Sequence, residues 1–468
     1  MKKIVICGNG LGVVVLALEL SNSKNIDVTV INSKNIWGGY FGGIESNGVR
    51  FDLGMNLFEF KSYIDSSSNI FDYNPYVKSD SGRFSDLIED YIKNVIETEI
   101  VDTPNVYFRG SYYKDYYISN SLEILSALTD EEKFEMIAEL KLILMNPNNL
   151  HARNKNKNPE LFYKYSYLEV SLANHGRLFH DKFIEPLVLK ILNIESNDIP
   201  AVFHRIPWAP LFYPESLLDY LASNRSPFLE AEFEYPKKKN FSALVDKLVG
   251  RMLDKQNVQV LNEQVASINF KKKEVILETK NKIAFDELIY GNDLLDFDGI
   301  NNKSENLVQF RKENFTFVFI RVKGIDVRSN FSVLFIVDSN VPCFRITNQS
   351  NLKKCVEKDY IDLIIEFNTS RFEESLDSFL DVSDMIGHYL NELRVVEVFK
   401  PVFIDIRHFK NALTLPTFDN VCLYDEIKSR VDKIEDVHFI GNVNAMYANS
   451  FNDNIVQALL ISKKIQLC

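Results

Sequence analysis

The chain has 468 residues, of which 46% are hydrophobic and 25% are charged, and its net charge is −12 from 53 Lys and Arg against 65 Asp and Glu. This composition excludes a disordered or collagen-like chain, and the length favours roughly three structural units. Because an acidic surface repels nucleic-acid phosphates, we expect no nucleic-acid partner.

The N-terminal segment is predicted to form a strand, a glycine turn and a helix. Residues 3–7 are apolar and suit a buried strand, Gly8-Asn9-Gly10-Leu11-Gly12 turns the chain, and residues 13–20 suit a helix. Glycine lets a pyrophosphate approach the N–H groups at the helix N-terminus. The third glycine of the G-x-G-x-x-G pattern is replaced by Val13. A glycine turn of another α/β protein is the alternative, but the strand–turn–helix context favours dinucleotide binding.

The second predicted strand, residues 27–31, ends at Asn32 and Ser33. Dinucleotide-binding folds usually place an acidic residue there, which accepts a hydrogen bond from the adenosine ribose. The amide oxygen of Asn32 can accept the same bond, without the gain from an ionised acceptor.

The rest of the chain changes character twice. Residues 61–235 are predicted to be largely helical, and α/β character returns from residue 241. Strong alternation over residues 315–370 predicts a second sheet. A late strand at 436–441 runs into a glycine, and a helix follows at 453–465.

The cysteines and the apolar runs of the sequence indicate the cellular compartment in which the protein is expected. The five cysteines are widely scattered and form no C-x-x-C pair, which argues against a disulfide framework or a zinc ribbon, and we expect no metal site. No run reaches the roughly 18 apolar residues that span a bilayer. Glycines at 8, 10 and 12 interrupt the only segment that looks like a signal peptide. We therefore expect a cytoplasmic protein without a membrane span.

Two motifs downstream of the second strand carry a family resemblance. Trp37-Gly38-Gly39-Tyr40 and Gly48-Val49-Arg50-Phe51-Asp52-Leu53-Gly54 resemble the "GG" and "G-x-x-x-D-x-G" segments of FAD-dependent amine-oxidase-like proteins. That superfamily includes protoporphyrinogen oxidase and UDP-galactopyranose mutase.

Further matches follow in the family's order and cover nearly the whole chain. Residues 174–192 resemble the cap helix of sugar-locus relatives, and 258–268, with Val265, resemble the segment that meets the adenine. Residues 342–348 (PCFRITN) resemble a substrate-sheet motif of the mutase-like branch, and Phe439-Ile440-Gly441 with Asn452 downstream resembles the terminal flavin motif. The chain is thus nearest to the UDP-galactopyranose mutase-like branch.

The resemblance implies an α/β fold with a Rossmann-like FAD-binding domain. This domain is expected to be discontinuous, from residues 1–60, 236–300 and 425–468. Residues 61–235 are expected to form a helical cap, and residues 301–424 a second, mostly antiparallel sheet that faces the substrate.

The implied cofactor is FAD, with several family contacts replaced by asparagine. Asn442 stands where relatives have arginine, Asn452 where they have aspartate, and Asn56 where they have the histidine of a "GPH" turn. The expected FAD contacts are Gly8, Gly10, Leu11, Gly12, Asn32, Ser33, Gly38, Gly39, Val265, Gly441, Asn442 and Asn452.

Three residues are candidates for catalysis. Asn56 is expected near the flavin ring by the resemblance. Arg345 lies in an apolar strand, where a buried arginine needs an anionic partner, which is either substrate or a carboxylate such as Glu366. His408, next to Arg407, is a candidate acid or base, although such a dipeptide is usually solvated surface.

The resemblance favours a flavin-dependent oxidoreductase or mutase that acts on a small molecule, a nucleotide sugar or related surface-glycan precursor. A non-catalytic binding or assembly module with weakened FAD binding is a second reading, motivated by the asparagines. Amine-oxidase-type chemistry and an NAD-linked dehydrogenase are further alternatives. Substrate identity, net oxidation against isomerisation, and the oligomeric state stay open.

Overall fold

The computed structural model of the chain describes residues 1–468 except 35, 61–66, 68, 76–79, 147–158, 227, 295–296, 298–308, 325–326, 328–329, 355–358, 447, 449 and 468. The expected domain boundaries at 60/61 and 300/301 touch residues outside this description. No helix in the described part of the chain is long and apolar enough to cross a bilayer.

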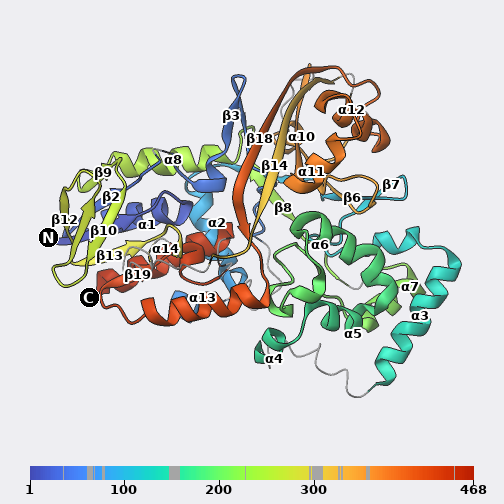
Figure 1. Ribbon diagram of the computed structural model, residues 1–468, viewed down its shortest axis with the longest axis horizontal. Helices are drawn as coiled ribbons and strands as arrows, with labels where there is room; N and C mark the ends of the chain where they lie inside the picture. The colour runs from blue at the N-terminus through green and yellow to red at the C-terminus, as the bar shows by residue number, and fades with distance from the viewer. Residues whose placement is uncertain are drawn as a thin grey trace.

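A parallel sheet forms one half of the molecule (Figure 1). Among the described residues its five strands lie in the order β19-β13-β1-β2-β9, and all neighbours are parallel. Their Val- and Ile-rich sequences suit strands that are covered on both faces. They come from three separate stretches of the chain: β1 (Lys2–Cys7), β2 (Ile26–Ile31), β9 (Val258–Leu261), β13 (Glu287–Tyr290) and β19 (Val437–Phe439).

Helices cover one face of the parallel sheet, and a meander with one helix covers the other. Helix α1 (Leu11–Ser21) contacts both α8 (Ser242–Leu253) and α14 (Phe451–Leu467). Helix α1 is apolar around nearly its whole circumference, and all its residues except Glu19 are buried. The opposite face packs on α13 (Phe418–Val431) and on the antiparallel meander of β10 (Val265–Asn269), β11 (Glu274–Leu277) and β12 (Lys282–Ala284).

The other half contains a mixed sheet. In the described part of the chain seven strands have the order β18-β14-β17-β16-β15-β6-β7, and only β15 and β6 are parallel neighbours. The long strands β14 and β18 run toward the parallel sheet and connect the two halves (Figure 1). The bounds are β6 (Asn105–Phe108), β7 (Ser111–Lys114), β14 (Lys312–Lys323), β15 (Val333–Ile336), β16 (Arg345–Asn348), β17 (Tyr360–Asn368) and β18 (Pro401–Thr414).

Each face of the mixed sheet has its own cover. Helices α11 (Thr369–Leu376) and α12 (Val382–Glu392) pack on one face, and α10 (Gln349–Leu352) follows β16. The hairpin of β3 (Ile44–Ser46) and β4 (Val49–Phe51) packs Phe51 against Phe319 on the other. The α-helices of the remaining segment are α2 (Ser85–Lys93), α3 (Asp130–Met145), α4 (Pro159–Lys164), α5 (Tyr167–Phe179), α6 (Glu185–Leu192) and α7 (Pro214–Ser223).

Short helical turns join these elements. They are η1 (Gly39–Gly42), η2 (Ile70–Asp72), η3 (Asp80–Phe84), η4 (Glu123–Ala127), η7 (Ser196–Asp198), η8 (Ala201–Phe203) and η10 (Gly441–Val443), all 3₁₀, and η6 (His180–Ile184), a π-helical turn between α5 and α6.

The segment expected to be a helical cap also contains strands. Strands β5 (Thr98–Val101) and β8 (Phe233–Pro236) pair with each other, and β6 and β7 belong to the mixed sheet. The φ angles of 50° at Arg109 and 77° at Gly110 suit a two-residue hairpin turn between β6 and β7. The aromatic residues of these strands are typical of a sheet, so the expectation of helices and loops there was too simple.

Candidate functional site

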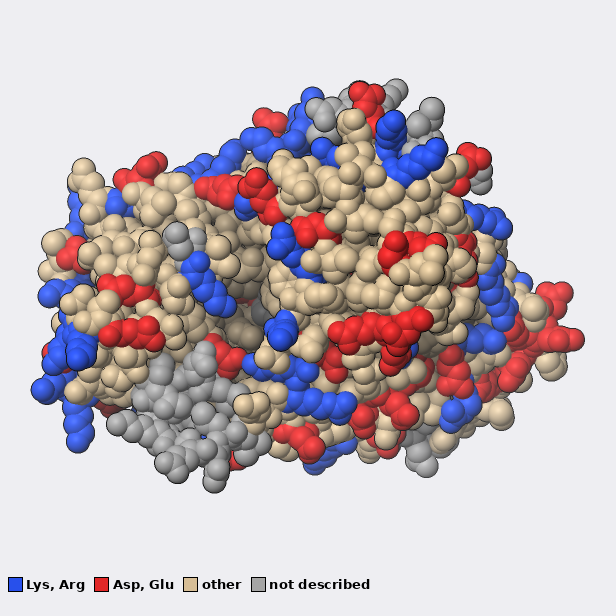
Figure 2. Space-filling model, turned by 45° about the horizontal axis from the view of Figure 1, so that its top comes forward, with Lys and Arg blue, Asp and Glu red and all other residues tan. Residues whose placement is uncertain are grey.

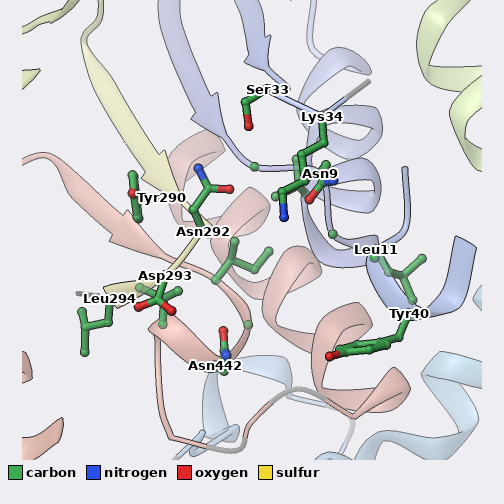
Figure 3. A pocket seen from close by; sticks show the side chains of 18 of the residues that line it. Asn9, Leu11, Ser33, Lys34, Tyr40, Tyr290, Asn292, Asp293, Leu294 and Asn442 are labelled. Carbon is green, nitrogen blue, oxygen red and sulfur yellow. The ribbon is translucent and has the colours of Figure 1, made fainter. Parts of the chain in front are cut away.

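A cavity of about 1300 Å³ lies at the carboxyl ends of the parallel strands (Figure 3), where open α/β sheets bind their ligands. It exceeds the roughly 300–1,000 Å³ typical of small-molecule pockets, so it has room for a dinucleotide. Gly12 and Asn452, although both are described, lie outside its wall. The other expected cofactor contacts line it: Gly8, Gly10, Leu11, Asn32, Ser33, Gly38, Gly39, Val265, Gly441 and Asn442.

The glycine turn presents the N-terminus of α1 to this cavity. Gly8 has a φ of 145°, and a Cβ there would lie 3.0 Å from Val13 Cγ2, so only glycine fits. Gly10 precedes α1 and gives it no side-chain cap. A Cβ on Gly10 would meet nothing within 4 Å, because it points into open space. The first N–H groups of a helix lack partners within it, so this end is suited to an anion.

Two amide side chains of α14 hold the glycine turns in place. The N–H of Gly12 donates to Asn454 Oδ1 at 3.2 Å, and the N–H of Gly441 donates to Gln457 Oε1 at 2.8 Å. A Cβ on Gly12 would lie 2.9 Å from Asn454 Oδ1, so this glycine permits close packing of α1 on α14. Asn454, which lines the cavity, was missed from the sequence because Asn452 matched the family motif.

Asn32 is buried at the end of β2 and is bonded to its own loop. Its Nδ2 donates to the Ile36 carbonyl at 3.0 Å, and its Oδ1 accepts from the Lys34 N–H at 3.2 Å. One lone pair of Oδ1 is left for a ligand. Ser33 and Lys34 lie at one end of the cavity and Tyr40 at the other (Figure 3).

The Tyr40 end is formed by both halves of the molecule. The Tyr40 hydroxyl donates to the Ala412 carbonyl at 2.6 Å, near the end of β18. Across the cavity from Tyr40, Asp293 pairs with Lys312 at the start of β14, at 2.8 Å from Nζ to Oδ2, and all four residues line the cavity (Figure 3). A ligand that extends from the glycine turn toward Tyr40 therefore reaches the junction of the two halves.

The family motifs after β2 support the cavity structurally. Gly38 has a φ of 85°, and a Cβ there would lie 2.7 Å from Val245 Cγ1 of α8. The buried Asp52 carboxylate accepts from the Tyr235 hydroxyl and from the N–H groups of Phe241 and Ser242 at 3.1 and 3.3 Å. Burial raises the pKa of Asp52, and these bonds oppose the rise. Asp52 therefore caps α8.

The three catalytic candidates do not come together. None of Asn56, Arg345 and His408 is part of the cavity wall formed by the described residues. Asn56 is mostly buried and donates weakly to the Leu53 carbonyl at 3.4 Å. His408 Nδ1 lies 2.9 Å from Thr316 Oγ1, and the strand register puts it on the opposite face of the mixed sheet from Arg345.

Arg345 is buried and pairs with Glu366. Its Nε and Nη2 each donate to one carboxylate oxygen at 2.6 Å, and its guanidinium lies 4.5 Å from the Trp208 ring centre. Its Nη1 has no hydrogen-bond partner among the described residues. The carboxylate that the sequence suggested is therefore present, and one buried donor is left over.

Two residues of the cap, Trp208 and Arg205, were missed from the sequence. Trp208 contacts Arg345, and Arg205 Nη1 donates to the Trp208 carbonyl at 3.2 Å. Trp208 has a left-handed φ of 57°, a strain that accumulates at functional sites. Arg205 Nη1 donates to the Tyr117 carbonyl at 2.6 Å. Desolvation raises the pKa of Glu59, and the nearby Arg205 opposes the rise, although Glu59 is exposed to solvent. A hollow is visible near the centre of the face shown in Figure 2.

Solved structures with the same fold span the whole chain. A reduced UDP-galactopyranose mutase has a TM-score of 0.73 at 16% identity, over 100% of this chain and 94% of the other. A putative protoporphyrinogen oxidase from Exiguobacterium sp. 255-15 has 0.65 at 13%, over 100% and 99%. A putrescine oxidase bound to putrescine has 0.63 at 12%, over 100% and 99%. No protein-family model and no curated protein matches the sequence. The expected α/β fold, with a Rossmann-type parallel sheet and a second, mixed sheet, is confirmed.

Proposed function

We propose that the cavity binds FAD and that the chain is a flavin-dependent oxidoreductase or mutase. The observation that carries the proposal is the open cavity over the N-terminus of α1, to which Gly10 gives no side-chain cap. The diphosphate would bind at Gly10 and Leu11, the adenosine toward Ser33 and Val265, and the flavin ring toward Tyr40. The shared fold with a mutase and two oxidases supports this proposal.

Bound FAD would supply the redox or nucleophilic chemistry of its ring, and the chain would supply position and shielding. Leu11 would donate its N–H to the diphosphate. Tyr40, bonded to Ala412 of β18, would hold the mixed sheet against the ring end and restrict water there. Lys312, paired with Asp293, would offer an ammonium donor beside the cofactor.

We propose a nucleotide sugar or related glycan precursor as the substrate. Its diphosphate is an anion, and the buried Nη1 of Arg345 is a donor without a partner among the described residues. Trp208, stacked on the same guanidinium, offers a flat surface for a base or sugar. Arg205, half-buried in the cap and bonded to the Trp208 carbonyl, adds a second cation. A small diamine would not need these cations, which disfavours amine oxidation.

A non-catalytic descendant is the second candidate. It is favoured by the amide contacts of the site, since Asn454 and Gln457 occupy the N–H groups of Gly12 and Gly441. Asn56 also replaces the family's histidine beside the ring. On this reading the fold is kept for binding or assembly, and FAD is held weakly or not at all.

FAD uptake separates these readings. The purified chain, stripped of small molecules, is titrated with FAD and separately with NAD⁺. Binding is followed by the quenching of flavin fluorescence for FAD and by calorimetry for NAD⁺. Saturable FAD uptake with no response to NAD⁺ supports the proposal. No FAD uptake favours the non-catalytic reading, and NAD⁺ uptake alone indicates a nicotinamide enzyme. With FAD bound, consumption of a uridine diphosphate sugar then tests the substrate class.

A further inference from the structure

Strand β18 has an outer edge that no strand of the described chain covers. It is 14 residues long and ends the mixed sheet, with β14 as its neighbour on one side. An edge strand exposes unpaired N–H and C=O groups, and natural proteins usually keep such edges short. The Tyr40 hydroxyl binds the carbonyl of Ala412 at one end, so the remaining free stretch is residues 401–410.

The side chains on one face of this stretch form a symmetric series about the position of Ile406, and its two phenylalanines also pack on Phe51 and Phe317 of the same chain. On one face lie Phe403, Asp405, Arg407 and Phe409, in the order aromatic, acid, base, aromatic. That they share a face is shown by the bond from Arg407 Nε to Asp405 Oδ2 at 3.0 Å. Arg407 is 48% exposed and Asp405 17%, so both charges can reach a partner.

We propose that β18 pairs with β18 of a second copy of this chain, antiparallel and centred on Ile406. The two mixed sheets then form one continuous sheet across a two-fold axis, which is the usual symmetry of a homodimer. Phe403 of each copy lies opposite Phe409 of the other. Asp405 of each copy lies opposite Arg407 of the other. Aromatic pairs and opposite charges are the cross-strand pairs that stabilise a sheet.

The charges select this register against its neighbours. A two-fold axis normal to the sheet requires that opposite residues share a face, so the strands can slip only by even steps. A slip of two residues, the smallest allowed, in one direction places Asp405 opposite Asp405 of the second copy. The same slip in the other direction places Arg407 opposite Arg407. Like charges directly opposite destabilise a pair, so the register centred on Ile406 is favoured.

The opposite charges of Asp405 and Arg407 also distinguish this edge from an edge that is protected against strand pairing. Edges that resist pairing carry charges that repel an incoming strand, whereas alternating charges attract a copy of themselves. A single strand pair buries less surface than a standard stable interface. The dimer is therefore a reversible one, populated as the concentration rises.

Sedimentation velocity across a concentration series tests this inference. The wild-type chain is expected to show a monomer–dimer equilibrium. Asp405→Arg and Arg407→Asp, made singly, each place like charges opposite each other twice and are expected to weaken dimerisation about tenfold or more. The double variant restores opposite charges and is expected to return the dissociation constant to within about threefold of wild type. Arg430→Asp, on the exposed face of α13, is the control for net charge.

Two outcomes overturn the proposal. One is a wild-type chain that stays monomeric at every concentration, and the other is a dimer that neither single reversal weakens. Hydrogen exchange is a second measurement that needs no variant. The outward amides of residues 402–408 are expected to exchange more slowly as the wild-type concentration rises, and exchange independent of concentration contradicts the pairing.

Discussion

Gly10→Val is the substitution that bears most directly on the anion site. The φ of Gly10 is −66°, which valine adopts without strain, and a Cβ there meets nothing within 4 Å. The chain should therefore fold as before, with a free energy of unfolding within about 0.5 kcal/mol of wild type. The two methyl groups would instead fill the space over the N-terminus of α1.

The expected loss of FAD affinity follows from the donors at that helix end. The N–H of Gly12 is occupied by Asn454, which leaves those of Leu11 and Val13 for a diphosphate. A hydrogen bond to a charged group contributes about 1.5–3 kcal/mol, so the loss of two costs about 3–6 kcal/mol. At about 1.4 kcal/mol per tenfold change, the dissociation constant for FAD should rise roughly 10²- to 10⁴-fold.

The assay is a fluorescence titration of the stripped protein with FAD, alongside denaturant unfolding of the same samples. Gly250→Val is the matched control, because Gly250 lies in α8, is exposed, and also has nothing within 4 Å of an added Cβ. The control should bind FAD like wild type. If Gly10→Val binds FAD as tightly as the control does, the diphosphate does not sit at this turn and the reasoning is refuted.

Three further substitutions test other parts of the account. Asp52→Ala removes the acceptor that caps α8 and should lower the free energy of unfolding by about 2–4 kcal/mol in urea; an unchanged midpoint would show that the cap is dispensable. Burial lowers the pKa of His175 to about 3, so between about pH 3 and 6.5 this side chain binds a proton only when the chain unfolds. The free energy of unfolding should therefore decrease by about 1.4 kcal/mol for each unit by which the pH is lowered in that window. His175→Gln should remove this contribution when it is compared with wild type by urea unfolding at each pH. Arg345→Ala should weaken uridine diphosphate binding about tenfold or more in calorimetry and FAD little. Because removing one partner of a buried ion pair destabilises a protein, the double variant Arg345→Met, Glu366→Leu serves as the stable comparison, and retained nucleotide binding there would make Arg345 structural.

Elements that are buried within one local segment could be predicted well. A strand was expected at residues 3–7 and a helix at 13–20, and the structure has β1 at Lys2–Cys7 and α1 at Leu11–Ser21. The turn at Gly8 was also found, because strand, glycines and helix follow one another within a few residues. In such segments the periodicity of apolar residues carries the information.

Elements whose partners lie far along the chain were not predicted. Strand β6 pairs with β15, whose residues come more than 200 positions later, and no local pattern identifies that partner. Likewise Trp208 meets Arg345 only through the packing of the cap on the mixed sheet. Asn454 was missed for a different reason. Asn452 and Asn454 both lie in the first turn of α14, and the rotation of the helix, which the motif does not specify, decides that Asn454 faces the cavity.

A crystal structure of the chain grown with FAD would test the central claim most directly. The account predicts density for the diphosphate within hydrogen-bond distance of the Leu11 N–H, the adenine toward Val265 and the flavin ring toward Tyr40. Clear density for FAD at another place, or a cavity that holds only water at saturating FAD, would contradict it.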